Sequence, residues 1–525
     1  MSTTIEIPFP RASELFIAQP RQVIWASVAL LVVFYYLLPL FFQRSSNFPS
    51  INYDKSQWTY IQAKSKFRGH AKTLIAQGFQ KFSGPFNVVT DTGPLVMLPP
   101  EYIDAVNQEP KLNFNKFTEQ ELLSKYETFR NFRSPPPGLF EEAVMKGLTR
   151  SLPKFTKFLS DEMTQCLNET WEHSAEWHEV DLREDVLTWV ARLSSRIFNE
   201  DRLTRNEEWL RISKEYTVNS FTAIAICKIV PAPLRWIVER TLPICRKVRA
   251  DRKAGAKLLA PILAERKAEI VAAQREGREP QLPDDSIEWF RRASKGREYN
   301  DIDLQLSLSI AAIHTTSDLL GQALLNLCAH PEMVEPLRKE AIEVLGKHGW
   351  KKVALTELHL LDSFLKETQR LKPIAMTSMH RLALDDVELP NGVVIRKGER
   401  TAISSHRMWS ETDYENPDKF DGYRFVKRRK LPGYEHRSHL ISTSHDHTAF
   451  SHGKHACPGR FFAANEVKIA MVHLFLKYDM KMEHPSSAKW MEYGINMYVD
   501  PAAKISVRRR REELDMDDLV VDTQG

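Results

Sequence analysis

The most distinctive setting for a reactive side chain in this sequence belongs to Cys457. It stands in the segment Phe450–Gly459, which reads F-S-H-G-K-H-A-C-P-G. Gly453 permits a tight turn ahead of the cysteine, and Pro458 suits the first turn of the helix that the pattern of residues 460–472 predicts. Cys457 is therefore expected at a helix N-terminus, where the dipole and free N–H groups favour a thiolate. A thiolate held in this way is a strong metal ligand.

Two other interpretations of this cysteine remain open on local grounds. An unligated cysteine is usually a small buried hydrophobe, and Cys457 could fill that role at a loop–helix junction. Cysteine and histidine are also zinc ligands, although neither a second cysteine nor a regular paired spacing accompanies the histidines that crowd this stretch. These histidines are His436, His439, His445, His447, His452 and His455.

The wording F-x-x-G-x-H-x-C-x-G resembles the signature of the haem-thiolate monooxygenases, the cytochrome P-450 family. The resemblance implies that Cys457 is the axial ligand of a haem iron and that Phe450 packs beside it. Gly453 belongs to the same cofactor-binding motif, and His455 is expected to face a haem propionate. This chain departs from the commonest wording by having Ser451 for Gly and His455 for Arg.

A long apolar helix is expected upstream, from Leu304 to Leu327, and such a helix should run through the core. Its hydroxyl groups could simply bond back to the preceding turn. The resemblance instead implies that Thr315 lies on the oxygen side of the haem, in a locally distorted stretch, and that His314 replaces the usual acid. A similar replacement occurs in fungal members of the family that tailor secondary metabolites. We expect His314 either to relay protons or to bond a neighbouring helix.

A glutamate and an arginine three residues apart, Glu367 and Arg370, lie on one face of a helix that ends before Pro373. Alone, this spacing is common on protein surfaces. The resemblance implies a buried pair completed by Arg424 from F-D-G-Y-R-F, a structural triad that organises the loop on the ligand side. It also implies that Arg381 reaches a haem propionate. A second propionate ligand is also implied. Lys146 and Arg150 are candidates for it, and the sequence does not decide between them.

Composition sets the frame for these elements. With 42% hydrophobic and 27% charged residues the chain is globular. Helical periodicity dominates from residue 153 to residue 275, and Val88–Leu98 reads as a β-hairpin. The expected fold is mainly α with a small β region, the cytochrome P-450 fold, in one domain over residues 56–507. Because 73 basic and 68 acidic residues nearly balance, nothing points to nucleic acid.

An uncharged run, Val23–Phe42, is long enough to cross a bilayer as a single helix. A cleaved signal peptide is the alternative, but no small-residue cleavage site follows. Basic residues after the run outnumber those before it, which places the body on the cytosolic side. We therefore expect a non-cytosolic segment at 1–22, the anchor at 23–42, a hinge at 43–55 and a solvated charged tail at 508–525. Five unpatterned cysteines also fit a reducing compartment.

The function that the resemblance implies is oxidation of a hydrophobic secondary metabolite with O2 and electrons from NADPH. The partners would be a membrane-bound NADPH-cytochrome reductase and a terpenoid-type substrate (diterpene, indole diterpene or meroterpenoid), at the endoplasmic reticulum membrane. Two alternatives stay open: a haem-thiolate isomerase or dehydratase that needs no reductase, and a membrane-tethered haem-binding protein without catalysis.

Overall fold

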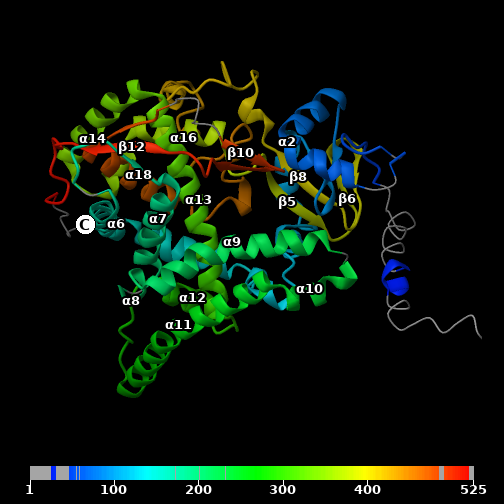
Figure 1. The fold of residues 1–525 in the computed structure, drawn as a ribbon, viewed down its shortest axis with the longest axis horizontal. Coiled ribbons are helices and arrows are strands. Elements are labelled where there is room, and N and C mark those ends of the chain that lie inside the picture. The colour runs from blue at the N-terminus through cyan, green and yellow to red at the C-terminus, as the bar shows by residue number, and fades with distance from the viewer. Residues whose placement is uncertain are drawn as a thin grey trace, which may run out of the picture.

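The computed structural model describes residues 25–30 and 46–519, apart from residues 55, 58–59, 172, 200, 231 and 484–489. Helices dominate, with small sheets gathered mainly at one end (Figure 1). The expectation of a mainly helical fold with a small β region is confirmed. The helices are α2 (Ile61–Lys81), α3 (Ile103–Gln108), α4 (Phe114–Glu121), α5 (Leu139–Glu142), α6 (Thr149–Thr170), α7 (Leu182–Phe198), α8 (Asp201–Thr204), α9 (Glu207–Ile229), α10 (Arg235–Thr241), α11 (Pro243–Glu276), α12 (Ser286–Ser294), α13 (Asp301–Ala329), α14 (Val334–His348), α15 (Lys352–Glu357), α16 (His359–Leu371), α17 (Arg424–Arg429) and α18 (Arg460–Lys477).

In the described ranges the strands form four sheets. The largest has the order β1-β2-β8-β5-β3 and contains the predicted hairpin, in which β1 and β2 pair antiparallel. Its strands are β1 (Phe86–Thr90), β2 (Gly93–Leu98), β8 (Arg400–Ser404), β5 (Thr377–Ala383) and β3 (Leu112–Asn113). The smaller sheets are β4 (His178–Val180), β12 (Ile505–Arg509) and β9 (Tyr478–Lys481); β10 (Trp490–Tyr493) with β11 (Asn496–Val499); and β6 (Val387–Leu389) with β7 (Val393–Ile395).

The centre of the molecule is α13, which passes between the helical end and the main sheet (Figure 1). Asn300 caps this helix by accepting a hydrogen bond from the backbone of Asp303 at 3.1 Å. Most of its apolar side chains are buried against α7, α9, α16 and α18. A helix that is apolar nearly all round is stable only in such a position, as the sequence predicted.

Helices α9 and α11 pack against each other; α9 runs beneath the sheet end, whereas α11 extends away from it toward the lower left (Figure 1). The described residues between them include the short helix α10 and the 3-10 turn Ala232–Leu234. The prolines Pro233 and Pro243 therefore break the connection rather than the two long helices. In α11, Pro261 is accommodated inside the helix.

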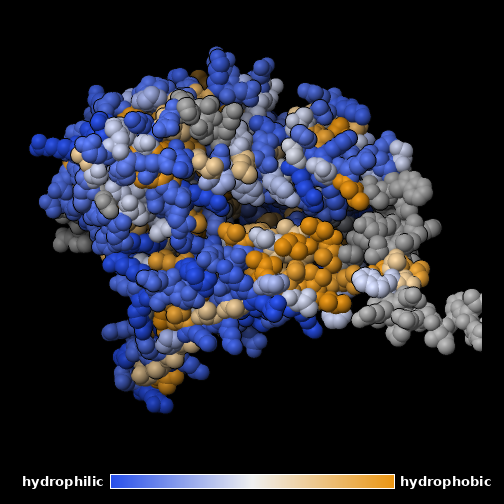
Figure 2. Space-filling view, viewed as in Figure 1, coloured by the Kyte–Doolittle hydropathy of each residue, from blue (hydrophilic) through white to orange (hydrophobic). Residues whose placement is uncertain are grey.

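An exposed apolar surface covers the end of α9 and continues onto α10 (Figure 2). We call it the α9–α10 patch. Large contiguous apolar surfaces are unusual on soluble monomers and mark contact sites. Its residues are Val218, Phe221, Ile226, Ile229, Leu234, Trp236 and Ile237.

The two ends of the chain differ in how much the structure describes. The predicted anchor, Val23–Phe42, lies outside the described residues except for 25–30, which are helical and exposed. Within the described ranges, none of the helices is both long and apolar enough to cross a membrane.

The C-terminal segment was expected to be a solvated charged tail from residue 508, but its first part packs against the domain. Strand β12 extends to Arg509 and pairs with β9, so Arg508 lies opposite Asp479 in the sheet. Farther on, Met516 is fully buried and its carbonyl accepts a hydrogen bond from Trp350 Nε1 at 3.0 Å. The cause is tertiary: a sheet edge and an indole N–H provide partners that no local pattern reveals. The domain body therefore extends beyond residue 507.

Helix α18 carries a buried acid, Glu466, which forms no ion pair with the part of the chain that the structure describes. Its side chain is fully buried, and one oxygen accepts a hydrogen bond from Ser194 Oγ of α7 at 3.1 Å. The other oxygen has no protein partner among the described residues. Burial raises the pKa of Glu466 to about 8. The carboxyl is therefore neutral in the folded protein at neutral pH.

This gives a prediction on pH and stability. Because the folded pKa of Glu466 lies above its unfolded value, the folded state holds the proton more tightly, and stability falls as the pH rises from the unfolded pKa toward 8. Glu466→Gln should remove that fall, a difference of at least ~1.4 kcal/mol, the equivalent of one pKa unit. Thermal unfolding by circular dichroism across this range measures it. The exposed Glu298→Gln is the matched control, and equal pH slopes in all three proteins would contradict the prediction.

Candidate active site

Cys457 lies in a short loop between the 3-10 turn Gly453–His455 and the start of α18. Its backbone N–H donates to the carbonyl of Phe450 at 2.8 Å, which closes the loop. Gly453 has φ 73°, and a Cβ added there would collide with the side chain of Asn107 on α3. Only glycine fits this position. Arg460, the first residue of α18, donates from its guanidinium to the carbonyl of Cys457 at 2.8 Å.

Opposing effects act on the pKa of the Cys457 thiol. Burial raises the pKa, and this effect is the larger. Hydrogen bonds from the backbone of Gly459 and Arg460, at the N-terminus of α18, lower it. The helix end alone therefore does not produce a thiolate. A metal ion bound to the sulfur would, because a coordinating thiol is deprotonated outright. The setting fits a metal-ligating cysteine better than a free reactive one.

A buried cation lies close to this loop. Arg381 of β5 is completely buried, and its Nε and Nη2 atoms have no protein partner among the described residues. Burial lowers the pKa of Arg381 to about 10. The guanidinium lies 5.8 Å from the ring centre of Phe114, and the ring of His455 lies 5.4 Å from the same ring. A buried guanidinium with free donors favours an anionic ligand, and a propionate carboxylate meets that requirement.

The strand that carries Arg381 is irregular at this point. The register of β5 against β8 shifts between Ser378 and Arg381, and Met379 between them has φ 49°. A bulge of this kind bends a strand and re-aims the side chains that follow it.

The predicted triad residues meet beside α16. The carboxylate of Glu367 accepts from Arg370 Nε at 2.8 Å and Nη2 at 2.9 Å, and from Arg424 Nε at 3.0 Å. Glu367 and Arg370 are completely buried. Arg370 also donates to the carbonyls of Met408 and Pro417. The pair is therefore a buried junction between distant segments rather than a surface contact.

On α13, Thr315 and Ala311 lie one turn apart and are accessible, whereas Ile313 and Thr316 between and beside them are buried. Thr315 Oγ1 donates back to the carbonyl of Ala311 at 2.7 Å. The helix is continuous here, without the expected local distortion. This accessible face in the middle of the core helix is where a ligand could reach Thr315.

His314 points elsewhere. Its Nε2 lies 2.9 Å from the carbonyl oxygen of Lys214 on α9, and burial lowers the pKa of the imidazole. The bond to a carbonyl places the proton on Nε2 and leaves Nδ1 as the acceptor. This arrangement corresponds to the expected alternative in which His314 joins a neighbouring helix.

A sequence model of the family described as Cytochrome P450 matches residues 139–507. The chain belongs to the cytochrome P450 family. It is a P450 monooxygenase, and the family implies a haem held by a cysteine thiolate. Cys457 is placed to be that ligand, and Arg381 and His455 are placed to contact the haem propionates.

Curated relatives cover nearly the whole P450. The chain is 41% identical to cytochrome P450 monooxygenase esdpI of Penicillium shearii, over 87% of this chain and 90% of the relative. It is 42% identical to cytochrome P450 monooxygenase hepE of Aspergillus oryzae, over 87% and 84%. With cytochrome P450 monooxygenase eqxH of Fusarium heterosporum the identity is 37%, over 96% and 99%.

The two candidates for a second propionate ligand are both solvent-accessible. Lys146 is exposed and forms an ion pair with Glu142 at 2.6 Å. Arg150 is also exposed, on the first turn of α6.

The histidines near Cys457 do not form a zinc centre with it. Among the described residues, the group whose ligand atoms could share one metal ion consists of Asp104, His445 and His452, without the cysteine. His447 is buried against Phe425, and the ring of His455 packs near the ring of Phe114.

Three residues that support the P450 site were not predicted from the sequence. The ring of Phe114 lies near both Arg381 and His455, and Asn107 accepts from the backbone of Lys454 at 2.9 Å. Lys366 of α16 donates to two carbonyls of the loop that precedes the cysteine, and burial lowers its pKa to about 7. These contacts join residues that lie far apart in the sequence, so no local signal could have identified them.

The first prediction from this site concerns the ligand. If Cys457 holds the haem as a thiolate, the reduced protein with carbon monoxide should show the strongly red-shifted Soret band of thiolate ligation. Cys457→Ser should lose that band, because a hydroxyl does not ionise to replace the thiolate. The buried Cys166→Ser, on α6, is the control and should keep it. A red-shifted band in Cys457→Ser would exclude this cysteine as the ligand.

The second prediction concerns the triad. Glu367→Ala leaves the buried charge of Arg370 without its partner, at a cost of roughly 3–5 kcal/mol. We expect a strong loss of haem incorporation, measured as the ratio of haem to protein after purification. Glu208→Ala, which breaks a pair of the same spacing with Arg211 on the exposed face of α9, is the matched control. Normal haem content in Glu367→Ala would mean that the junction does not hold the cysteine side of the site.

Proposed function

We propose that this P450 hydroxylates or otherwise oxidises a hydrophobic fungal secondary metabolite, using O2 and electrons from NADPH delivered by a membrane-bound reductase. The observation that carries the proposal is the placement, in a chain of this family, of Cys457 and of the buried Arg381, whose Nε and Nη2 have no partner among the described residues. The haem, when bound, supplies oxygen activation and the transfer of one oxygen atom. The protein residues orient the substrate and manage protons.

Two stretches of chain close to α13 support an apolar substrate. The stretches around Ile374 and Ile495 meet through backbone hydrogen bonds, from Met376 to Ile495 and from Met497 to Ile374. Strand β11, which follows, contacts α13. Apolar side chains predominate in these stretches, which suits a hydrophobic ligand fixed by few polar contacts. The substrate that we propose is terpenoid-type: a diterpene, an indole diterpene or a meroterpenoid.

We also propose the endoplasmic reticulum membrane as the location, with a single N-terminal anchor at Val23–Phe42 and the catalytic domain facing the cytosol. The uncharged run supports the anchor. The exposed α9–α10 patch supports contact between the domain and the bilayer surface, because its Trp and branched apolar side chains suit the lipid interface (Figure 2).

Within the site, we assign proton management to Thr315. Its hydroxyl is accessible and can turn from the carbonyl of Ala311 to hold a water molecule that would carry protons toward the haem side of the helix. His314 is a proton relay only if its Nδ1 exchanges protons while Nε2 stays bonded to Lys214.

Microsomes that contain the protein and reductase test the proposal. With an extract of the producing fungus as the source of substrate, NADPH should be consumed and one oxygen atom added to a hydrophobic metabolite. Substrate conversion without NADPH would instead indicate an isomerase or dehydratase. Thr315→Ala should keep haem and substrate binding but divert NADPH into hydrogen peroxide. His314→Phe should do the same if His314 relays protons, and wild-type coupling in His314→Phe would make it structural.

A strain that lacks this protein identifies the substrate class. It should accumulate a hydrophobic precursor with one oxidation fewer than the final product. A precursor that is not built from isoprene units would contradict the terpenoid assignment while leaving the monooxygenase intact.

A further inference from the structure

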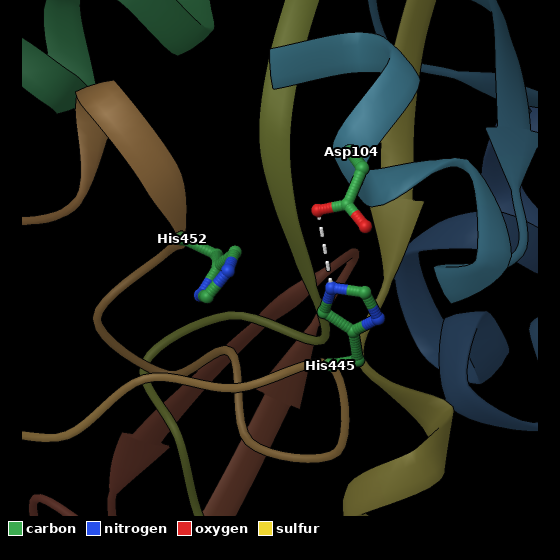
Figure 3. A group of neighbouring side chains, drawn as sticks. All are labelled: Asp104, His445 and His452. Carbon is green, nitrogen blue, oxygen red and sulfur yellow. Dashed lines mark hydrogen bonds and ion pairs between the residues drawn. The ribbon is translucent and has the colours of Figure 1, made fainter. Parts of the chain in front are cut away.

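Three side chains with metal-binding atoms converge on the surface beside the Cys457 loop. Asp104 comes from α3, and His445 and His452 come from the segment that leads to the cysteine (Figure 3). One ligand atom from each lies within 4.8 Å of the other two. His445 Nε2 already lies 3.3 Å from Asp104 Oδ1. The two imidazole rings are perpendicular, at 5.5 Å between centroids.

We propose that Asp104, His445 and His452 bind a divalent transition-metal cation, with zinc as the preferred ion. Two imidazoles and a carboxylate, with water in the fourth position, form a zinc ligand set. Ligand atoms on one tetrahedral zinc are about 3.3 Å apart, given bonds of about 2.0–2.1 Å. The observed separations therefore need only small side-chain rotations. Asp104 and His445 can make them freely, since 67% and 37% of their side-chain surfaces are exposed.

A neighbouring hydroxyl prepares one of these histidines for the metal. His452 Nδ1 lies 2.9 Å from Thr443 Oγ1. When Nδ1 donates to this hydroxyl, Nε2 carries the free lone pair, and outer hydrogen bonds of this kind orient metal-binding histidines. Burial lowers the pKa of His452, which favours the neutral, ligating form of the ring.

The metal would join two elements that already touch at an adjacent point. One helical turn after Asp104, Asn107 accepts a hydrogen bond from the backbone of Lys454 and fills the space beside Gly453. The same side of α3 therefore contacts the loop twice, once through Asn107 and once through the proposed site. A bound ion would tie α3 to the segment 443–454, immediately ahead of Cys457.

This inference concerns a second metal, separate from the haem, and does not depend on the proposed substrate. The full-length, haem-loaded protein, purified in detergent without a polyhistidine tag, is dialysed against zinc and its zinc content is measured by atomic absorption. We expect one tight equivalent. His445→Ala, His452→Ala and Asp104→Asn should each weaken binding by more than the ~10–100-fold that changes to outer-shell partners cost. Unchanged binding in either histidine variant overturns the proposal.

Two controls separate the site from general histidine binding. The exposed His436→Ala, from the same histidine-rich stretch, should bind zinc as the wild type does. An equal loss in His436→Ala would show diffuse surface binding and overturn the site. Unchanged affinity in Asp104→Asn would reduce it to a histidine pair that does not reach α3, which also contradicts the proposal.

Hydrogen exchange tests the connection itself. Zinc should slow amide exchange both in residues 103–108 and in residues 443–454 of the wild-type protein. Neither segment should respond in His452→Ala. Protection of the loop without protection of α3 would exclude the tie between them.

Discussion

Glu367 and Arg370 form a carboxylate–guanidinium pair that is fully removed from solvent. This pair fixes the relative positions of the segments on the cysteine side of the molecule. A buried charge is costly unless its hydrogen-bonding capacity is satisfied. Here Glu367 accepts from two arginines and from the backbone of Asp421, and Arg370 reaches two further carbonyls. These partners come from separate segments, so the arrangement is favourable only when all of them are in place together.

Helix α16 extends this principle along its length, because many of its polar residues are buried. Ser363 bonds the carbonyl of Gly422 and receives the backbone N–H of Phe425. Asp362 accepts from Lys468 of α18 and from the backbone of Leu440. The helix thus connects α18, which follows Cys457, to the loop that precedes Cys457. The position of Cys457 depends on both connections.

How much could be predicted from sequence varies with how local the signal is. The hairpin at β1–β2, the core helix α13 and the helix after Cys457 follow from periodicity and turn residues. Glu367, Arg370 and Arg424 could be chosen only because a family pattern joined two distant motifs. The partner of His314 is a backbone carbonyl, which has no sequence signature. The charged run after Arg508 appeared solvated because its partners, β9 and Trp350, are determined by the tertiary fold.

The irregularity in β5 has a consequence for how this strand tolerates changes of length. Alternate residues of a strand face opposite sides, so one residue inserted or removed reverses every side chain beyond it. The extra residue near Met379 sets which side receives Arg381 and which receives its neighbours. A change of one residue in length between Ser378 and Arg381 would therefore turn the guanidinium away from Phe114. At this point the strand is intolerant of a change in length.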